Sequence, residues 1–360
     1  MTGDEYMMLR CINLAKQAVG HVSPNPFVGC VIVKNGKIIS EGYHKKFGSA
    51  HAEANALETA ITKGIDLEGA WLYCNLEPCY HQGKTPPCVD KIIDHKFSKV
   101  IIGMKDPNPL VSGKSIRKLK KNGINVSVNV LEGECRKLNK FFIKHITTGL
   151  PYITIKAAQT MDGKIAHENY DSKWITSYES RMLVHKMRNK YDAVLVGRKT
   201  VLYDDPQLTV RHVRGRNPYR IIIDTRLSLK TTFKLFTDSK AEKTIILTGK
   251  IKNKKKAVEL ESRSVKIFEC KTKRGIIDLK DALKKMGAIG IASIMVEGGS
   301  ETYSHFFKQK LVDEVKIFLS PKVFGDGIRL FKNDFDFSAN MRSVQKIGSD
   351  VLFKFILKEY

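Results

Sequence analysis

Residues 76–88 read Leu-Glu-Pro-Cys-Tyr-His-Gln-Gly-Lys-Thr-Pro-Pro-Cys and leave eight residues between Cys79 and Cys88. Upstream lies His51, followed two residues later by Glu53. One imidazole and two thiolates leave the fourth tetrahedral position of Zn²⁺ open to water, as a catalytic zinc site requires. Glu53 is placed to move a proton between that water and a departing amine without binding the metal. The pattern predicts a zinc-dependent hydrolytic deaminase in the first half of the chain.

Two other interpretations of these residues remain open at this point. Cys79 and Cys88 can be ordinary buried thiols, with His51 on the surface and Glu53 at a helix start. A structural zinc site is the second, and it would need a fourth protein ligand. His81 is the obvious spare ligand, whereas Cys74 is a poorer candidate near the end of a predicted strand.

Apolar periodicity predicts a β-sheet layered with helices around this motif. Asn35-Gly36 is a tight-turn signal between two extended segments and predicts a hairpin. Helices are expected over residues 4–19, 51–63, 88–95, 113–121 and 133–146, and strands over 28–33, 37–42, 70–75, 99–103 and 124–130.

Residues 147–151 read Thr-Thr-Gly-Leu-Pro and predict a junction, so we expect one domain over 1–147 and another over 148–360. Residues 250–275 are lysine-rich and weakly periodic, and we expect a variable surface region there. In the second domain, strands are expected over 152–157, 192–196, 219–223, 243–247, 292–296, 315–319 and 351–356, and helices over 177–188, 278–286 and 301–310.

Two strand–glycine–helix junctions stand out in the second domain, one at Gly197 and one at Gly298-Gly299-Ser300. A glycine turn lets the backbone approach a phosphate, and a helix N-terminus offers free amide donors. Taken alone, each glycine turn more often only connects a strand to a helix and binds no cofactor. The chain has no Gly-x-Gly-x-x-Gly fingerprint, so a Rossmann fold has no support.

Composition narrows the class of protein. The 360 residues carry a net charge of +25, but the excess is spread along the chain and does not form a basic arm. We therefore expect a solvated lysine surface that attracts phosphorylated small molecules, and no nucleic-acid or membrane partner. Seven cysteines, an odd number, argue against a disulfide framework. No apolar run is long enough to span a membrane, and residues 1–10 do not read as a secretory signal, so the cytoplasm is expected. A homo-oligomer is expected.

The motif and its surroundings resemble the bifunctional deaminase–reductases of riboflavin biosynthesis, the RibD-type family. The resemblance runs in order from about residue 5 to the C-terminus. Besides residues 76–88 it rests on Ser23-Pro24-Asn25-Pro26, Gly42-Tyr43-His44, Asp106-Pro107-Asn108-Pro109, Met161-Asp162-Gly163-Lys164-Ile165-Ala166, Trp174-Ile175-Thr176-Ser177, Thr200-Val201-Leu202, Asp204-Asp205-Pro206, Leu208-Thr209-Val210-Arg211 and Val296-Glu297-Gly298-Gly299.

The resemblance implies two consecutive reactions on one chain. A cytidine-deaminase-like three-layer domain would remove the 2-amino group of 2,5-diamino-6-ribosylamino-4(3H)-pyrimidinone 5′-phosphate. A dihydrofolate-reductase-like domain would then reduce the ribosyl group with NADPH to give 5-amino-6-ribitylamino-uracil 5′-phosphate. One Zn²⁺ and NADPH are the implied cofactors, and a small pyrimidine nucleotide is the implied partner.

Family roles place zinc on His51, Cys79 and Cys88 and make Glu53 the proton carrier. They also imply that deaminase substrate contacts come from Asn25, His44, Lys84 and Thr85. Two positions depart from the family pattern, and neither is a ligand: Ser49-Ala50 stands where Gly-Pro is common, and Ser115 stands where a glycine is usual.

The resemblance also assigns a reductase site. The NADPH contacts would come from Ala158, Trp174, Thr200, Asp204, Thr225, Gly299, Ser300, Glu301, Thr302, Tyr303, Ser304 and His305. The substrate contacts would come from Ser172, Arg188, Leu208, Arg211 and Glu297. Arg188 and Arg211 suit a 5′-phosphate through bidentate pairing. No residue is identified as the proton donor.

Two other functions compete with this one. A deaminase acting on a nucleic-acid base is motivated by the same zinc motif and by the net charge, but the long spacing and the reductase-like half argue against it. A non-catalytic zinc scaffold is disfavoured because Glu53 is present and no fourth ligand is evident.

Overall fold

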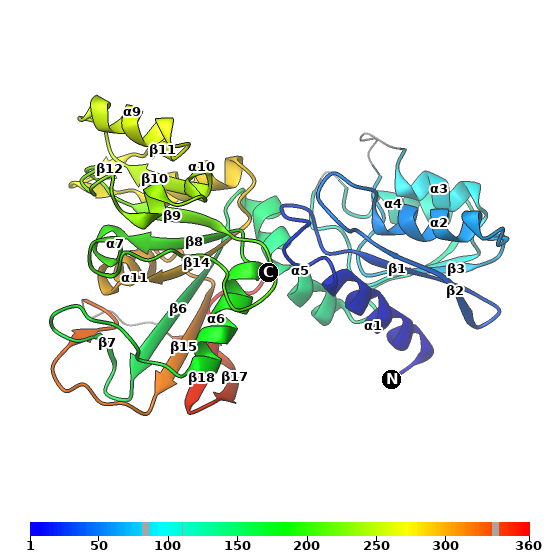
Figure 1. The fold of residues 1–360 in the computed structure, drawn as a ribbon. Coiled ribbons are helices and arrows are strands. Elements are labelled where there is room, and N and C mark those ends of the chain that lie inside the picture. Colours follow the sequence, from blue (N-terminus) through cyan, green and yellow to red (C-terminus); the bar gives the residue numbers. More distant parts are fainter. Residues whose placement is uncertain (81–85, 110, 333–337) are drawn as a thin grey trace. The chain divides into compact units, whose positions relative to one another are not determined.

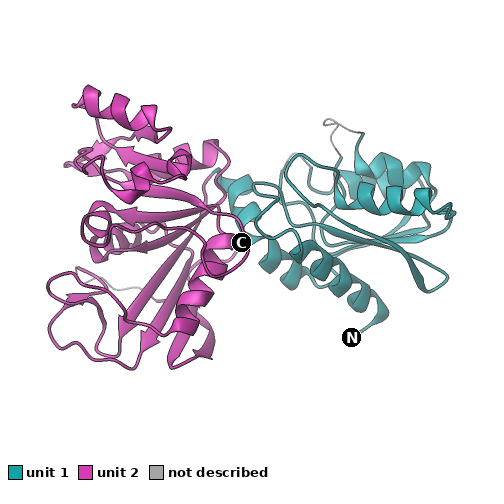
Figure 2. Ribbon diagram, in the orientation of Figure 1, with its two compact units in different colours: residues 1–149, 360 teal, residues 150–359 magenta. Residues whose placement is uncertain are grey.

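The computed structural model describes residues 1–80, 86–109, 111–332 and 338–360. The chain forms two compact units, residues 1–149 together with residue 360, and residues 150–359 (Figure 2). The last helix of the first unit continues through Thr148, and Gly149 ends it with a left-handed φ of 69°. No helix among the described residues combines the length and the apolar character that crossing a membrane requires.

Unit 1 is built on a five-stranded sheet with the order β2-β1-β3-β4-β5. Helices α1 and α5 cover one face of this sheet, and α2, α3 and α4 cover the other (Figure 1). The predicted three-layer α/β domain is therefore confirmed. Its strands are β1 (Gly29–Lys34), β2 (Lys37–Tyr43), β3 (Trp71–Cys74), β4 (Lys99–Ile102) and β5 (Asn125–Ser127), and its helices are α1 (Gly3–Lys16), α2 (Ala52–Thr62), α3 (Cys88–Asp94), α4 (Lys114–Lys121) and α5 (Glu132–Thr148).

Local chemistry explains how α2 reaches its position. Asn35 and Gly36 both adopt positive φ, 50° and 73°, which produces the predicted hairpin turn between β1 and β2. At Gly42 in β2, a Cβ atom would lie 2.4 Å from the Ala52 carbonyl oxygen of α2. The missing side chain lets the start of α2 lie directly against the sheet.

Unit 2 contains a nine-stranded sheet with the order β11-β10-β9-β8-β14-β6-β15-β18-β17. Every neighbouring pair from β11 to β15 is parallel, and β18 pairs antiparallel with both β15 and β17. This mixed sheet with packed helices confirms the α/β prediction for the second half. Its strands are β6 (Tyr152–Thr160), β8 (Ala193–Gly197), β9 (Tyr219–Ile223), β10 (Thr244–Thr248), β11 (Lys266–Glu269), β14 (Ser293–Gly298), β15 (Glu314–Ser320), β17 (Asn340–Ile347) and β18 (Asp350–Ile356).

Two small two-stranded sheets and several helices complete unit 2. The small sheets pair β12 (Thr272–Lys273) with β13 (Ile276–Ile277) and β16 (Ile328–Arg329) with β7 (Lys164–Ala166). The helices are α6 (Tyr178–Lys190), α7 (Arg198–Asp204), α8 (Lys234–Thr237), α9 (Lys254–Ser262), α10 (Leu279–Ala288) and α11 (Ser300–Lys308), with a 3₁₀ turn over Ala241–Lys243.

Residues 250–275, expected as a variable surface region, are largely exposed and contain regular elements that the sequence did not predict. Helix α9 begins after Asn253, whose side chain accepts a hydrogen bond from the Lys256 amide, and strand β11 follows it. Ala257 and Leu260 are buried, three residues apart on one face of α9. Three lysines, two glutamates, a serine and the exposed Val258 occupy the other positions of α9, so the apolar pattern is short and hard to recognise.

Candidate active sites

The predicted zinc ligands come together in unit 1. The Nδ1 or Nε2 atom of His51 and the Sγ atoms of Cys79 and Cys88 all lie within 4.8 Å of one another. The Cys88 sulfur lies 3.6 Å from His51 Nδ1. Zn–S and Zn–N bonds of about 2.3 and 2.1 Å at a tetrahedral angle separate the two ligand atoms by about 3.6 Å, so the geometry fits zinc.

Two helix N-termini deliver these ligands. His51 is the residue before α2, and Cys88 is the first residue of α3; the two helices lie side by side (Figure 1). The Cys88 amide donates to the Cys79 sulfur over 3.2 Å. Hydrogen bonds from Cys88 and His51 lower the pKa of the Cys79 thiol to about 4, which favours the thiolate form that binds zinc.

Glu53 lies in the first turn of α2 and is 3% exposed. Burial raises the pKa of its carboxyl to about 7, and the charge of the nearby Cys79 sulfur contributes to this rise. A carboxyl group that titrates near neutral pH can both accept and return a proton. Its surroundings therefore suit the predicted proton carrier.

His44 lies next to His51, a predicted zinc ligand, and Asn25 contacts His44. The rings of His44 and His51 meet edge to face, with centroids 5.7 Å apart. His44 Nδ1 lies 3.0 Å from the Ala50 carbonyl, an acceptor, so this nitrogen carries the proton. Nε2 then accepts from the Asn25 amide over 3.2 Å, and burial lowers the pKa of His44, which keeps it neutral.

The other predicted deaminase contacts, Lys84 and Thr85, lie outside the described residues, as does the spare ligand His81. Glu77 is a residue that the sequence analysis missed. It is 2% exposed and accepts from the Asp106 and Gly113 amides over 3.1 and 2.9 Å. It thereby joins the start of the Cys79 loop to residues 106–113.

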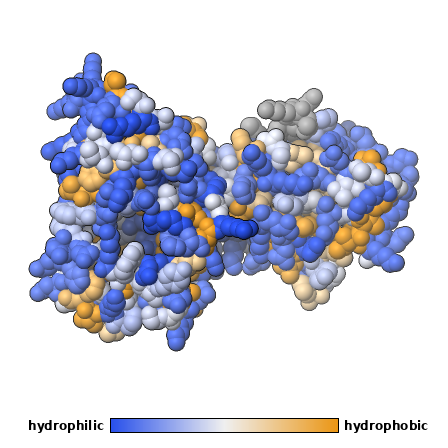
Figure 3. Space-filling model, in the orientation of Figure 1, coloured by the Kyte–Doolittle hydropathy of each residue, from blue (hydrophilic) through white to orange (hydrophobic). Residues whose placement is uncertain are grey.

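Unit 2 contains a cavity of about 950 Å³. Figure 3 shows a hollow on one face of this unit, bordered largely by hydrophilic residues. Predicted cofactor and substrate residues line the cavity: Ala158, Ser172, Trp174, Arg188, Thr200, Asp204, Arg211, Thr225, Glu297, Gly299, Ser300, Glu301, Thr302, Tyr303 and His305.

Both predicted strand–glycine–helix junctions are present at this cavity. Gly197 precedes α7, and Gly299 precedes α11. Gly298 has a φ of 156°, and a Cβ atom there would lie 3.3 Å from Thr200 Oγ1. A side chain at this positive φ would be strained and would crowd Thr200, so glycine keeps space beside the N-terminus of α11, a kind of site that suits a phosphate.

Two family models match the chain. The RibD C-terminal domain matches residues 151–353, and the cytidine and deoxycytidylate deaminase zinc-binding region matches residues 1–104. The riboflavin biosynthesis protein RibD of Aquifex aeolicus is 42% identical over 358 residues, with 98% of each chain covered. The chain belongs to the RibD family.

Solved structures of RibD proteins agree with this assignment. A Thermotoga maritima structure described as a diaminohydroxyphosphoribosylaminopyrimidine deaminase/5-amino-6-(5-phosphoribosylamino)uracil reductase is 40% identical, with a TM-score of 0.88 and 98% of each chain covered. Acinetobacter baumannii RibD is 34% identical, with the same TM-score and coverage. The resemblance to the RibD family is thus confirmed over nearly the full chain.

Ser115, one of the two departures from the RibD pattern, lies closer to the zinc site than its position in the sequence suggested. It is fully buried, and its hydroxyl lies 2.8 Å from a Glu77 carboxylate oxygen and 2.7 Å from the Pro78 carbonyl. Pro78 directly precedes the ligand Cys79. The hydroxyl therefore adds a donor to the network that supports the ligand loop.

Arg188 lines the cavity of the RibD reductase unit, and its guanidinium has partners within the protein. Its Nε and Nη2 atoms each donate to one carboxylate oxygen of Glu297 over 2.7 Å, and Nη1 donates to the Thr209 carbonyl. The bidentate fork predicted for a phosphate is thus engaged by Glu297. Arg211, which is exposed and lines the cavity, is the arginine better placed to meet a phosphate.

Two predicted residues, Leu208 and Ser304, are buried and are not among the described residues that line the cavity. The Ser304 hydroxyl accepts a hydrogen bond from the Lys332 amide over 2.9 Å. Ser304 therefore supports the cavity wall, and its position in the predicted Gly299–His305 run does not by itself bring it to the cofactor.

Lys156 and His185 line the RibD cavity and were missed from sequence. Burial lowers the pKa of Lys156, whereas the charge of Glu297 raises it in part. His185 Nδ1 accepts from the Arg211 amide over 3.1 Å. Both residues lie in ordinary strand or helix sequence, so no local signal marks them.

Proposed function

We propose that this chain catalyses two consecutive steps of riboflavin biosynthesis, a hydrolytic deamination in unit 1 and an NADPH-dependent reduction in unit 2. The observation that carries the proposal is the joint presence of the His51, Cys79 and Cys88 cluster and the glycine-bordered cavity in a chain that matches RibD proteins end to end. A small pyrimidine nucleotide phosphate is the substrate.

For the deaminase, His51, Cys79 and Cys88 would hold one zinc ion. When bound, zinc would strongly lower the pKa of a water molecule. Glu53 takes the proton from the attacking water and passes it to the amine, so that water replaces the ring amino group and ammonia leaves. Asn25 and neutral His44 lie beside the ligand set, where they can bind the pyrimidine.

For the reductase, the amides and hydroxyls around Gly298, Thr200 and α11 would bind NADPH. The cofactor supplies the hydride that turns the ribosyl group into ribityl. The second hydrogen arrives as a proton, and Lys156 is the cavity amine whose lowered pKa suits it to donate one. Glu297 and Arg188 hold each other at the same wall, and Arg211 would bind the substrate phosphate.

The proposal is tested by mass spectrometry of the diaminopyrimidine nucleotide incubated with the protein, with and without NADPH. We expect exchange of an amino group for oxygen in both samples and a gain of two hydrogens only with NADPH. The Glu53→Gln variant should lose the first change, retain its zinc, and still reduce the deaminated compound. Full deamination by this variant would disprove the assigned role of Glu53.

We also propose that the protein works in the cytoplasm as a homo-oligomer. Its seven cysteines are free, and most are buried, which suits a reducing compartment. Light scattering coupled to size-exclusion chromatography measures the oligomeric state. Cell fractionation identifies the compartment. A monomer at working concentration, or recovery outside the cytoplasm, would contradict the proposal.

A further inference from the structure

Residues 205–211 form the turn that carries Arg211 to the reductase cavity. Asp205 and Leu208 both adopt left-handed φ values, 37° and 52°, which are unfavourable for residues with side chains. Arg211 lines the cavity, whereas Gln207 and Leu208 are not among the described lining residues. Contacts behind the cavity must therefore hold this turn in its unusual shape.

Arg220 of β9 makes one of these contacts from within the protein. It is 1% exposed, and its Nη1 atom donates to the Gln207 carbonyl over 3.2 Å. The same guanidinium binds both carboxylate oxygens of Asp238, over 2.6 and 2.9 Å, and the Leu235 carbonyl over 2.9 Å. Thr244 Oγ1 accepts from Nη2 over 2.7 Å.

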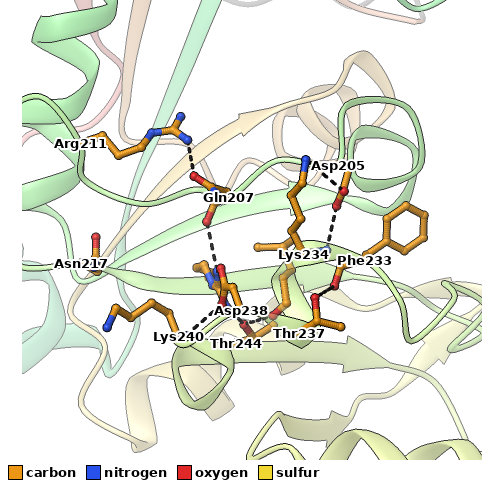
Figure 4. Close-up of polar contacts among 12 residues, drawn as sticks. Asp205, Gln207, Arg211, Asn217, Phe233, Lys234, Thr237, Asp238, Lys240 and Thr244 are labelled. Atoms are coloured by element: carbon orange, nitrogen blue, oxygen red, sulfur yellow. Dashed lines mark hydrogen bonds and ion pairs between the residues drawn. The ribbon is translucent and has the colours of Figure 1, made fainter.

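The Gln207 side chain connects the contact with Arg220 to Arg211 at the cavity. The backbone carbonyl of Gln207 is held by Arg220, and its side-chain oxygen accepts a hydrogen bond from Arg211 Nη1. Figure 4 shows Gln207 between Arg211 on one side and Asp238 on the other. The contacts form a continuous series from Asp238 through Arg220 and Gln207 to Arg211.

A second contact ties the same turn to the same segment. The backbone amide of Lys234, at the start of α8, donates to one carboxylate oxygen of Asp205 over 2.9 Å. The ammonium group of Lys234 lies 3.5 Å from the other carboxylate oxygen of Asp205. Residues 234–238 thus hold the turn at two points, Asp205 and, through Arg220, Gln207. Figure 4 shows Lys234 beside Asp205.

A buried guanidinium is a costly way to fill space, because its charge is removed from water. Its planar fork can, however, bind a carboxylate and a carbonyl in fixed directions at once, which a lysine ammonium cannot. Arg220 donates to the Asp238 carboxylate and to two backbone carbonyls in this way. It is not among the described residues that line the cavity. It therefore has no direct route to a ligand there.

We propose that Arg220, oriented by Asp238, is a positioning residue of the reductase: it fixes Gln207 so that Arg211 is held ready for the phosphate of the substrate. This inference rests on the proposed function, in which Arg211 binds that phosphate. It assigns to the Asp238–Arg220 pair the reductase's preference for a phosphorylated substrate over the same compound without phosphate.

The test uses the full-length, zinc-loaded protein and two substrates, the deaminated nucleotide and its dephosphorylated nucleoside. The variants are Asp238→Asn, Arg220→Lys and, as a direct probe of the phosphate contact, Arg211→Gln. Thr237→Ala is the matched control, because the Thr237 hydroxyl donates to the Phe233 carbonyl and takes no part in the contacts from Asp238 to Arg211. Reduction of the nucleoside, which has no phosphate for Arg211 to bind, checks that unit 2 of each variant is intact.

We expect Asp238→Asn to raise KM for the nucleotide about tenfold, the effect of one weakened charged hydrogen bond, with kcat and the nucleoside kinetics changed less than about twofold. Arg220→Lys should act in the same direction, and Thr237→Ala should match the parent. A general loss of stability would instead lower the rates with both substrates equally. If Arg220→Lys does not fold, Asp238→Asn decides the question.

Two results separate failure of this inference from failure of its premise. If Arg211→Gln removes the preference for phosphate but Asp238→Asn does not change it, Arg220 is not a positioning residue. If Arg211→Gln leaves the preference intact, Arg211 is not the phosphate contact, and both the premise and the inference are overturned.

Discussion

Lys156 brings an amine into a cavity wall that already contains the Arg188–Glu297 pair. A second cation there favours the binding of a phosphorylated cofactor or substrate. Lys156 also has the proposed task of donating a proton, because burial lowers its pKa toward the range in which an amine exchanges protons. Its neighbours supply both signs of charge, so the loss of one proton can be tolerated at this wall.

Replacing Lys156 tests whether its amine donates the proton in the reduction. Lys156→Met, which keeps the length of the side chain, should lower reductase kcat by about 100-fold, the lower range for loss of general acid catalysis. NADPH consumption with the deaminated substrate measures the effect, and ammonia release should not change. Unaltered kcat would remove Lys156 from the mechanism.

His185 provides a pH-dependent prediction. Burial and the charges of Arg188 and Arg211 lower its pKa to about 4. The unfolded chain binds a proton near pH 6.5 and the folded chain only near 4, so the stability of unit 2 should fall as the pH is lowered between these values.

The measurement is the thermal unfolding of unit 2 at several pH values between 7 and about 4. His185→Asn keeps an acceptor near the position of Nδ1 but does not titrate, so its unfolding temperature should fall less steeply. Identical slopes in the two proteins would show that His185 does not carry this dependence.

Residues of the zinc site could be predicted because Cys79, Cys88 and His51 lie in short motifs with diagnostic spacing. The bond between Arg188 and Glu297 could not, because it joins residues 109 positions apart. Sequence marks each of them as polar and near a cavity element, but only the fold decides whether a guanidinium meets a phosphate or a carboxylate.

Helix α2 and strand β2 illustrate how elements determine the deaminase site. The helix carries Glu53 in its first turn and packs on the strand where Gly42 leaves no side chain between them. A methyl group at this position would meet two backbone atoms of α2, Ala52 O at 2.4 Å and Ala56 N at 2.5 Å. Backbone cannot rotate aside as a side chain would, so the whole helix must shift.

Gly42→Ala should therefore destabilise unit 1 by about 1–3 kcal/mol and lower ammonia release, while reductase activity is retained. Gly133→Ala, in the first turn of α5, is the matched control because an added Cβ there meets no atom within 4 Å. Chemical denaturation of the two variants makes the comparison. Equal stability would show that α2 tolerates the displacement.

Elements with strong local signals were predictable, and their arrangement was not. The Asn35-Gly36 hairpin and the glycine turns before α7 and α11 follow from backbone preferences within a few residues. The order of the large sheet depends instead on contacts between distant segments, as when β14 inserts between β8 and β6. Short elements such as α9 were obscured by the lysines around them.

The whole molecule combines two chemistries with separate requirements. The zinc ligands belong to unit 1 and the cavity to unit 2. Treatment with a chelator should abolish ammonia release and leave reduction of the deaminated substrate within about twofold of its starting rate, since catalysis by a bound metal ends when the metal is removed. Added zinc should restore the first activity. Parallel loss of both activities would mean that zinc also supports unit 2.

The order of the sheet in unit 2 has a consequence for synthesis on the ribosome. Strand β6 pairs in parallel with β14, so that Tyr152 lies opposite Ser293, and β15 and β18 are added later still. All five strands of unit 1 lie before residue 149, so its sheet can assemble while the rest of the chain is still being made. The reductase sheet must wait for almost the last codon, and β6 and β8 emerge without their shared neighbour until β14 has been made. Nascent chains that stall within this interval would expose those two apolar strands, making the second half the part most dependent on chaperones.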